Sequence, residues 1–192
     1  MTERPESMPE NNVVDLLLRQ HQEIRRLFVE VQNATGDARV AAFDRLRRLL
    51  AVHETAEEEI VHPYARRAID GGATIIEARL AEENEAKTML SQLEDIDPGR
   101  PEFDQKLAAL RTAVIEHAEH EEKEEFPYIA KEATEQQLKG MAAAVKAAQA
   151  IAPTHPHPGV ESPTANLLTG PFAAMLDRTR DVVKRISGRQ KG

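Results

Sequence analysis

The sequence predicts an all-α protein, an up-down-up-down four-helix bundle with a C-terminal helical extension. Ala, Glu, Arg and Leu are the most frequent of its 192 residues, and these residue types favour helix. Apolar residues recur at helical spacing in four long stretches, which short segments rich in turn residues separate. Three short connections between four helices of similar length favour antiparallel neighbours.

The first helix is expected from Val13 to Val31, where Asn12 can cap its start and Asp15 lies in its first turn. Apolar residues recur along this segment at spacings of three and four, which defines a stripe that faces the core. The stripe consists of Val14, Leu17, His21, Ile24, Phe28 and Val31. A histidine is therefore expected inside the apolar face.

The second helix is expected from Arg39 to Ile69, the third from Thr74 to Leu93 and the fourth from Glu102 to Lys131. Pro63 and Pro127 should kink or end the second and fourth helices. The stripes of these two helices also contain His and Glu among apolar residues: Leu46, Leu50, His53, Glu57, Ile60 and Tyr64 in the second, and Leu107, Leu110, Val114, His117 and Glu121 in the fourth.

The chain is expected to form one domain with two appendages. Residues 1–11 are polar and should be disordered, and residues 12–131 should form the bundle. Residues 132–192 are expected to be an extension that packs on the bundle. This extension contains an Ala-rich fifth helix, a Pro-rich loop and a short last helix.

Charge and composition exclude several classes of protein. A net charge of −8 argues against nucleic-acid or anionic-membrane partners, which need a basic face. No apolar run approaches the roughly 20 residues of a membrane span, and the first residues lack the apolar segment of a secretory signal. A cytoplasmic location is expected. Because the chain has no Cys, only His nitrogen and carboxylate oxygen remain as strong metal ligands.

One pattern occurs twice, 64 positions apart: His53 with Glu57, and His117 with Glu121. On an α-helix this spacing leaves the two side chains roughly 40° apart around the axis and about 6 Å apart along it. A single pair of this kind is more often a solvated surface pair. Two pairs and His21, all within apolar stripes, predict a metal site, because buried charges need partners.

The third helix has no His, so a carboxylate should complete the site. The apolar residues of this helix point Glu83 most directly towards the core, and Glu82 is next. Alignment of the repeat by offset alone would instead pair Glu85 with His21. We choose Glu83 from its helical face, although Lys87 lies one turn on and offers it a simple ion pair.

Other polar residues near the pattern have simpler interpretations. His62 takes the place of Phe126 in the repeat and is expected to pack against the core; the alternative is that it touches the site. Glu54 directly follows His53 and could reach a metal from the side of the helix. Residues outside the stripes are expected to support the site or face solvent, namely Glu58, Glu122 and His120. Core packing is expected for Tyr64 and Tyr128, with a phenol near the metals as the alternative. A Pro-ordered loop, rather than a metal-binding tract, is expected for His155 and His157.

These residues resemble the hemerythrin-like, or HHE cation-binding, domain family, in particular its longer actinobacterial-type members. The resemblance covers about residues 12–131 and rests on His21, on the two His-x-x-x-Glu pairs and on the Phe-Pro that follows the second pair. It implies a non-haem di-iron centre, oxo- or hydroxo-bridged. Glu57 and Glu121 would bridge the two iron ions and the histidines would be terminal ligands. Mn or Zn are also acceptable to such ligands.

One departure from the family bears on function. Oxygen-carrying hemerythrins have two histidines on the third helix, where this chain offers Glu83. An added carboxylate favours ferric over ferrous iron, so a catalase-like reaction with hydrogen peroxide, or handling of nitric oxide and oxygen species under oxidative stress, is expected. The alternatives are a module that binds or senses oxygen, nitric oxide or iron without turnover, and a bundle without metal. The sequence leaves the oligomeric state open.

Overall fold

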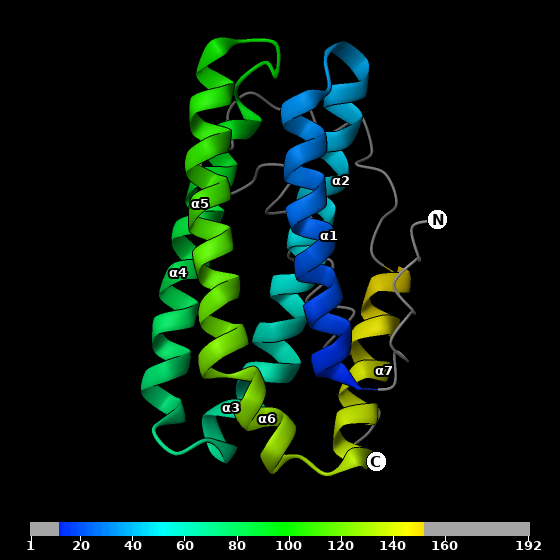
Figure 1. Ribbon diagram of the computed structural model, residues 1–192, viewed down its shortest axis with the longest axis vertical. Coiled ribbons are helices and arrows are strands. Elements are labelled where there is room, and N and C mark those ends of the chain that lie inside the picture. Colours follow the sequence, from blue (N-terminus) through cyan, green and yellow to red (C-terminus); the bar gives the residue numbers. More distant parts are fainter. Residues whose placement is uncertain (1–11, 152–192) are drawn as a thin grey trace, which may run out of the picture.

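The computed structural model describes residues 12–151, and this part of the chain contains helices and no strand. Four long helices run up, down, up and down (Figure 1), which confirms the predicted all-α bundle. They are α1 (Val13–Asn33), α2 (Gly36–Ala56), α4 (Gly72–Glu94) and α5 (Pro101–Glu124). No helix within residues 12–151 is long and apolar enough to cross a bilayer.

Several predictions concern residues outside this range. The disordered segment 1–11, the Pro-rich loop and the short last helix of the extension all lie outside the described residues. His155 and His157 lie there too.

Helix α1 begins where its capping residue predicts. The Asn12 side-chain oxygen accepts a hydrogen bond from the Asp15 backbone N–H at 3.0 Å. This bond satisfies one of the N–H groups that the first turn leaves without a partner inside the helix.

The second predicted helix is divided into three segments. A π-helical turn, η1 (Glu57–Val61), follows α2, and α3 (His62–Ala68) continues the chain. A π turn contains more residues than an α turn, so it rotates every later residue around the helix axis. Val61 and His62 are therefore buried, whereas Ile60 and Tyr64 of the predicted stripe are only partly buried.

The fourth predicted helix is divided as well. Helix α5 ends at Glu124, the backbone of Glu125 leaves the helical region at φ −121° and ψ −59°, and α6 (Phe126–Glu132) follows. Pro63 and Pro127 each lie in the first turn of the segment after the break, where proline lacks only an N–H that would be unpaired anyway. The predicted interruption by both prolines is confirmed.

The apolar core forms two clusters, one at each end of the bundle. The first lies between the long helices in the half of the bundle away from α3 and α6, and it contains Phe28, Leu50, Leu90 and Phe103. The second lies near the α3 and α6 ends and includes Leu17 and Val61. Along α1, α2 and α5 the polar residues of the predicted site lie between the residues of these two clusters.

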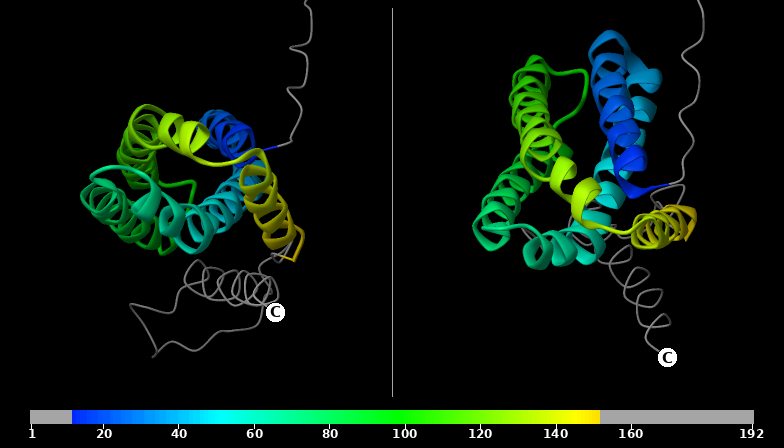
Figure 2. Two further views of the ribbon diagram at one scale, coloured as in Figure 1. Left: turned by 90° about the horizontal axis from the view of Figure 1, so that it is seen from below. Right: turned by 60° about the horizontal axis from the view of Figure 1, so that its bottom comes forward.

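Helix α7 (Glu135–Ile151) closes the second cluster. It lies beside the lower half of α1, outside the ring of bundle helices (Figures 1 and 2). Its buried residues Ala142 and Val145 belong to the second cluster.

Two glycines allow a matched test of packing. A Cβ on Gly72 would lie 2.5 Å from the carbonyl oxygen of Ala65, while one on Gly140 of α7 would meet nothing within 4 Å. We expect Gly72→Ala to lower the free energy of unfolding by about 1–3 kcal/mol, because backbone must move to admit the methyl group. Gly140→Ala should raise it by about 0.5–1 kcal/mol, because Ala favours helix. Urea unfolding of both variants measures these effects, and a loss of stability in Gly140→Ala would contradict the explanation.

Candidate metal centre

The six residues predicted to bind metal come together between the two apolar clusters, and each is buried. They form two groups of four, and in each group the possible donor atoms lie within 4.8 Å of one another. Glu57 and Glu121 belong to both groups. The first group adds His21 and His53, and the second adds Glu83 and His117.

Each of the three predicted histidines points one ring nitrogen towards the centre and bonds the other to an acceptor outside it. The Nε2 atoms of His21 and His53 are 3.1 Å apart, and Nε2 of His117 has no hydrogen-bond partner. Such outer acceptors orient metal-binding imidazoles. The Nδ1 partners are Glu122 for His21 at 2.8 Å, Gln20 for His53 at 2.7 Å and Glu82 for His117 at 3.0 Å.

The two shared carboxylates make no hydrogen bond inside the protein. Glu57 and Glu121 are 0% exposed, and all four of their oxygens are without a hydrogen bond. The nearest imidazole nitrogens, Nε2 of His53 and Nε2 of His21, are each 3.3 Å away. A buried carboxylate without a partner costs several kcal/mol. The donor set therefore fits bound cations, which would satisfy these oxygens.

Burial and neighbouring charges shift the pKa values of the cluster. Burial, and then the Glu121 carboxylate, raise the pKa of Glu57 well above its usual value. Burial opposes ionisation of Glu121 as well, but His117 and His21 outweigh it and lower its pKa to about 2. Burial, and then His21, lower the pKa of His53 well below its usual value. His53 is therefore neutral, which is the form that ligates metals.

Glu83 faces the core as its helical position predicts. It is 0% exposed, and its Oε1 accepts a hydrogen bond from His62 Nε2 at 2.7 Å. Its Oε2 lies 3.2 Å from Lys87 Nζ, so the expected ion pair is also present. Glu82 instead accepts the bond from His117, and Glu85 is exposed.

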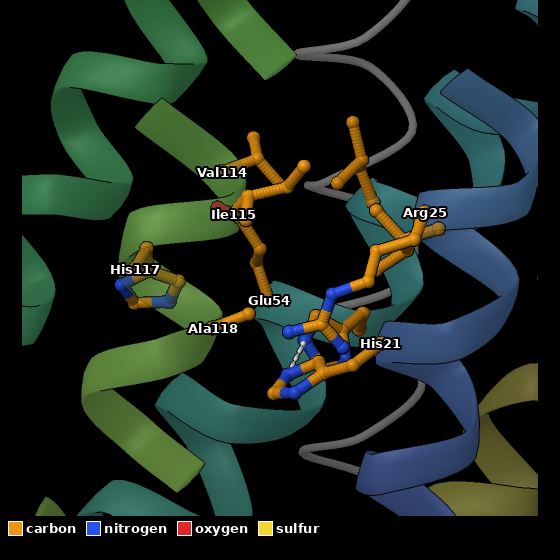
Figure 3. Close-up of a pocket in the computed structure, with 10 residues that line it drawn as sticks. His21, Arg25, Glu54, Val114, Ile115, His117 and Ala118 are labelled. Carbon is orange, nitrogen blue, oxygen red and sulfur yellow. Dashed lines mark hydrogen bonds between the residues drawn. The ribbon is translucent and has the colours of Figure 1, made fainter. Parts of the chain in front are cut away.

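A small cavity opens onto the histidines between α1, α2 and α5 (Figure 3). His21 and Arg25 of α1 lie on one side of it, and His117 of α5 lies on the other. The remaining wall is largely apolar and includes Leu50 and Val114. The space of about 10 Å³ is close to that of one water molecule.

The model of the hemerythrin HHE cation-binding domain matches residues 12–129. The chain belongs to this family. It is thus a metal-binding domain, and the His/Glu cluster described above is the part of the structure suited to that binding.

One of two similar proteins carries the name of this family. The chain is 23% identical to an uncharacterized hemerythrin-like protein of Schizosaccharomyces pombe. The match extends over 176 residues, which are 90% of this chain and 87% of the relative. It is also 29% identical to a DNA nickase of Nostoc sp. This match extends over 139 residues, which are 72% of this chain but only 39% of the nickase.

A solved structure has the same fold. A hemerythrin HHE cation-binding domain-containing protein from Mycobacterium kansasii matches with a TM-score of 0.64 and 22% identity, over 72% of this chain and 85% of that chain.

The HHE domain contains two buried site residues whose placement the sequence analysis did not predict. The expected packing of His62 against the apolar core was wrong and the alternative, contact with the site, agrees with the structure: His62 is 2% exposed and bonds to Glu83 and Glu125. The π turn explains the error, because it rotates His62 to the position that an uninterrupted α-helix gives to Val61. Glu125 was missed, although it follows Glu121 by four residues and so continues the same helical face.

The surrounding polar residues mostly support the inner ones. Glu122 accepts a hydrogen bond from His21, which agrees with its expected supporting role. His120 donates a hydrogen bond to Glu82 and remains partly exposed. Glu54 is buried near Lys87, at 3.5 Å, and Glu58 pairs with the same lysine.

The two tyrosines behave differently from each other. Tyr64 packs partly buried against the second apolar cluster, as expected. Tyr128 was expected in the core, and this was wrong, because it is 47% exposed. The new helix axis of α6 after the break at Glu125 turns Tyr128 away from the bundle.

Proposed function

We propose that this HHE domain holds two iron ions that share Glu57 and Glu121 and that it decomposes hydrogen peroxide. The observation that supports this most strongly is the pair of overlapping donor groups, since two shared carboxylates suit two adjacent cations. In this proposal His21 and His53 serve one ion, and His117 and Glu83 serve the other.

The balance of ligands favours peroxide over reversible oxygen carriage. The second group contains three carboxylates and one imidazole. Anionic oxygen ligands stabilise the higher oxidation state of iron, whereas an oxygen carrier must persist in the ferrous state. Bound iron would supply the electron transfer by which two molecules of hydrogen peroxide become two of water and one of oxygen.

The chain itself would orient the metal ligands, exclude water from them and limit the size of the substrate. Outer acceptors hold the three imidazole rings, and the apolar clusters on both sides exclude water from the carboxylates. The cavity beside His21 and His117 has room for about one water-sized molecule. A space of this size disfavours organic substrates, whereas hydrogen peroxide, oxygen and nitric oxide each have only two heavy atoms.

A second candidate function is a module that binds or senses oxygen, nitric oxide or iron without turnover. The same cavity supports it, because its size suits a diatomic ligand equally well. We propose no function on DNA: this chain covers 39% of the nickase, and its net charge of −8 opposes binding to a polyanion.

Exchange of Glu83 for His tests the proposed function. Wild-type protein should rest diferric and evolve oxygen from hydrogen peroxide. Glu83→His should slow this reaction by about tenfold or more, because an imidazole replaces a charged ligand, and should shift the protein towards reversible oxygen binding. Oxygen evolution from peroxide, and optical spectra under cycles of vacuum and air, measure the two activities.

The matched control is Glu85→His, which places the same side chain at an exposed position of the same helix. It should behave like the wild type. If wild-type protein forms a stable, reversible oxygen adduct and leaves peroxide untouched, the catalytic proposal is wrong and the binding module is correct.

A further inference from the structure

A third group of possible metal ligands adjoins the proposed pair. His62, Glu121 and Glu125 are all buried, and their possible donor atoms lie within 4.8 Å of one another. His62 follows the π turn and Glu125 lies at the break between α5 and α6, so both occupy the interruptions that precede the two prolines. The neighbouring segments α3 and α6 lie side by side (Figure 1). The proposed iron pair uses neither residue.

Glu125 is a carboxylate without sufficient partners. Its side chain is 0% exposed. One oxygen, Oε1, lies 3.1 Å from His62 Nδ1, while Oε2 has no hydrogen-bond partner. Because a buried carboxylate oxygen without a partner is costly, Oε2 calls for a cation or donor in addition to His62.

His62 is oriented as metal-binding histidines are. Its Nε2 donates to Glu83 Oε1 at 2.7 Å, which fixes the ring and directs Nδ1 towards Glu125. A carboxylate on the far nitrogen of a histidine orients the ring and raises the basicity of the nitrogen that binds the metal. Glu83 would thus support His62 with Oε1, while Oε2, which lies 3.2 Å from Lys87 Nζ, would serve the iron pair in place of that lysine.

We propose that His62, Glu125 and Glu121 form a third cation position beside the iron pair. One imidazole and two carboxylates suit a divalent ion of the Mn²⁺, Fe²⁺ or Zn²⁺ class. The position shares Glu121 with the proposed pair, and to that extent it rests on the proposed function. It gives Oε2 of Glu125, which has no hydrogen-bond partner, a cation that the pair, held by other residues, does not provide.

The test is a titration of iron-loaded protein with Mn²⁺, in which electron paramagnetic resonance measures the free ion. Wild-type protein should bind one Mn²⁺ per chain in addition to its two irons. Glu125→Gln should lose that ion, because an amide keeps the volume of the side chain but removes its charge. His62→Phe should lose it too; Phe is the residue at position 126, the counterpart of His62 in the repeat. The matched control is Glu119→Gln, an exposed glutamate of α5, which should retain the ion.

Iron content and the near-ultraviolet spectrum of the same samples separate this proposal from the proposed function. If wild-type protein holds two irons but binds no Mn²⁺, or if Glu125→Gln still binds it, the third position is wrong and the pair stands. If Mn²⁺ binds through Glu125 in protein without an iron pair, the proposed function fails and the third position stands. Crystals of the wild type measured at the manganese absorption edge give a check that needs no variant: the anomalous peak should lie between His62 and Glu125, and a peak elsewhere overturns the proposal.

Discussion

Exchange of Glu57 for Gln should leave the chain folded and remove both metal ions. Glu57 belongs to both groups of four possible ligands, is 0% exposed and makes no hydrogen bond with either oxygen. Gln has nearly the same volume but no charge, so the packing should persist while the shared ligand is lost. The expected metal content falls from two ions per chain to fewer than one, as measured by elemental analysis, with an unchanged helical circular dichroism spectrum.

The control for this variant is Glu85→Gln on the exposed side of α4, which should keep both ions. The repeat offset alone made Glu85 a candidate ligand, so this control also tests the choice between two interpretations of the sequence. His53→Ala and His117→Ala should show intermediate losses, because each histidine belongs to only one of the two groups. Two full metal equivalents in Glu57→Gln would refute the shared-ligand assignment.

Removal of the metal should lower the melting temperature by about 8–16 °C. An ion present at roughly a thousand times its dissociation constant stabilises the folded state by about 4 kcal/mol, and each kcal/mol corresponds to about 2–4 °C in a protein of this size. Glu57, Glu83, Glu121 and Glu125 are each 0% exposed, so without cations these carboxylates repel one another, and Glu57 takes up a proton more readily. The raised pKa of Glu57, caused first by burial and then by Glu121, shows the direction of that response.

Differential scanning calorimetry of metal-loaded and chelator-treated protein measures this difference, and elemental analysis verifies the removal. Glu57→Gln is the internal control, because its melting temperature should be nearly the same with and without metal in the buffer. Equal melting temperatures for loaded and stripped wild-type protein would show that the core is stable without metal.

The sequence by itself determined the helices and most of the residues that meet in the bundle. Helical periodicity placed His21, His53 and His117 among apolar residues, and a buried stripe can tolerate such groups only where they find partners. The same helical period favoured Glu83 over Glu85 as the ligand from α4, which has no histidine. In the structure Glu83 is buried and Glu85 is exposed. These predictions of burial are confirmed because each depends on one regular helix, whose period is constant.

Only the tertiary structure decided what lies at the helix breaks and around the inner residues. The π turn moved His62 into the cluster, and the break at Glu125 turned Tyr128 out to solvent. Neither event follows from a constant period, because a local change in residues per turn shifts every later side chain. The acceptors that orient the histidines, such as Glu82 on a neighbouring helix, depend on how helices pack against each other, since residues 35 positions apart in the chain meet only when the bundle closes.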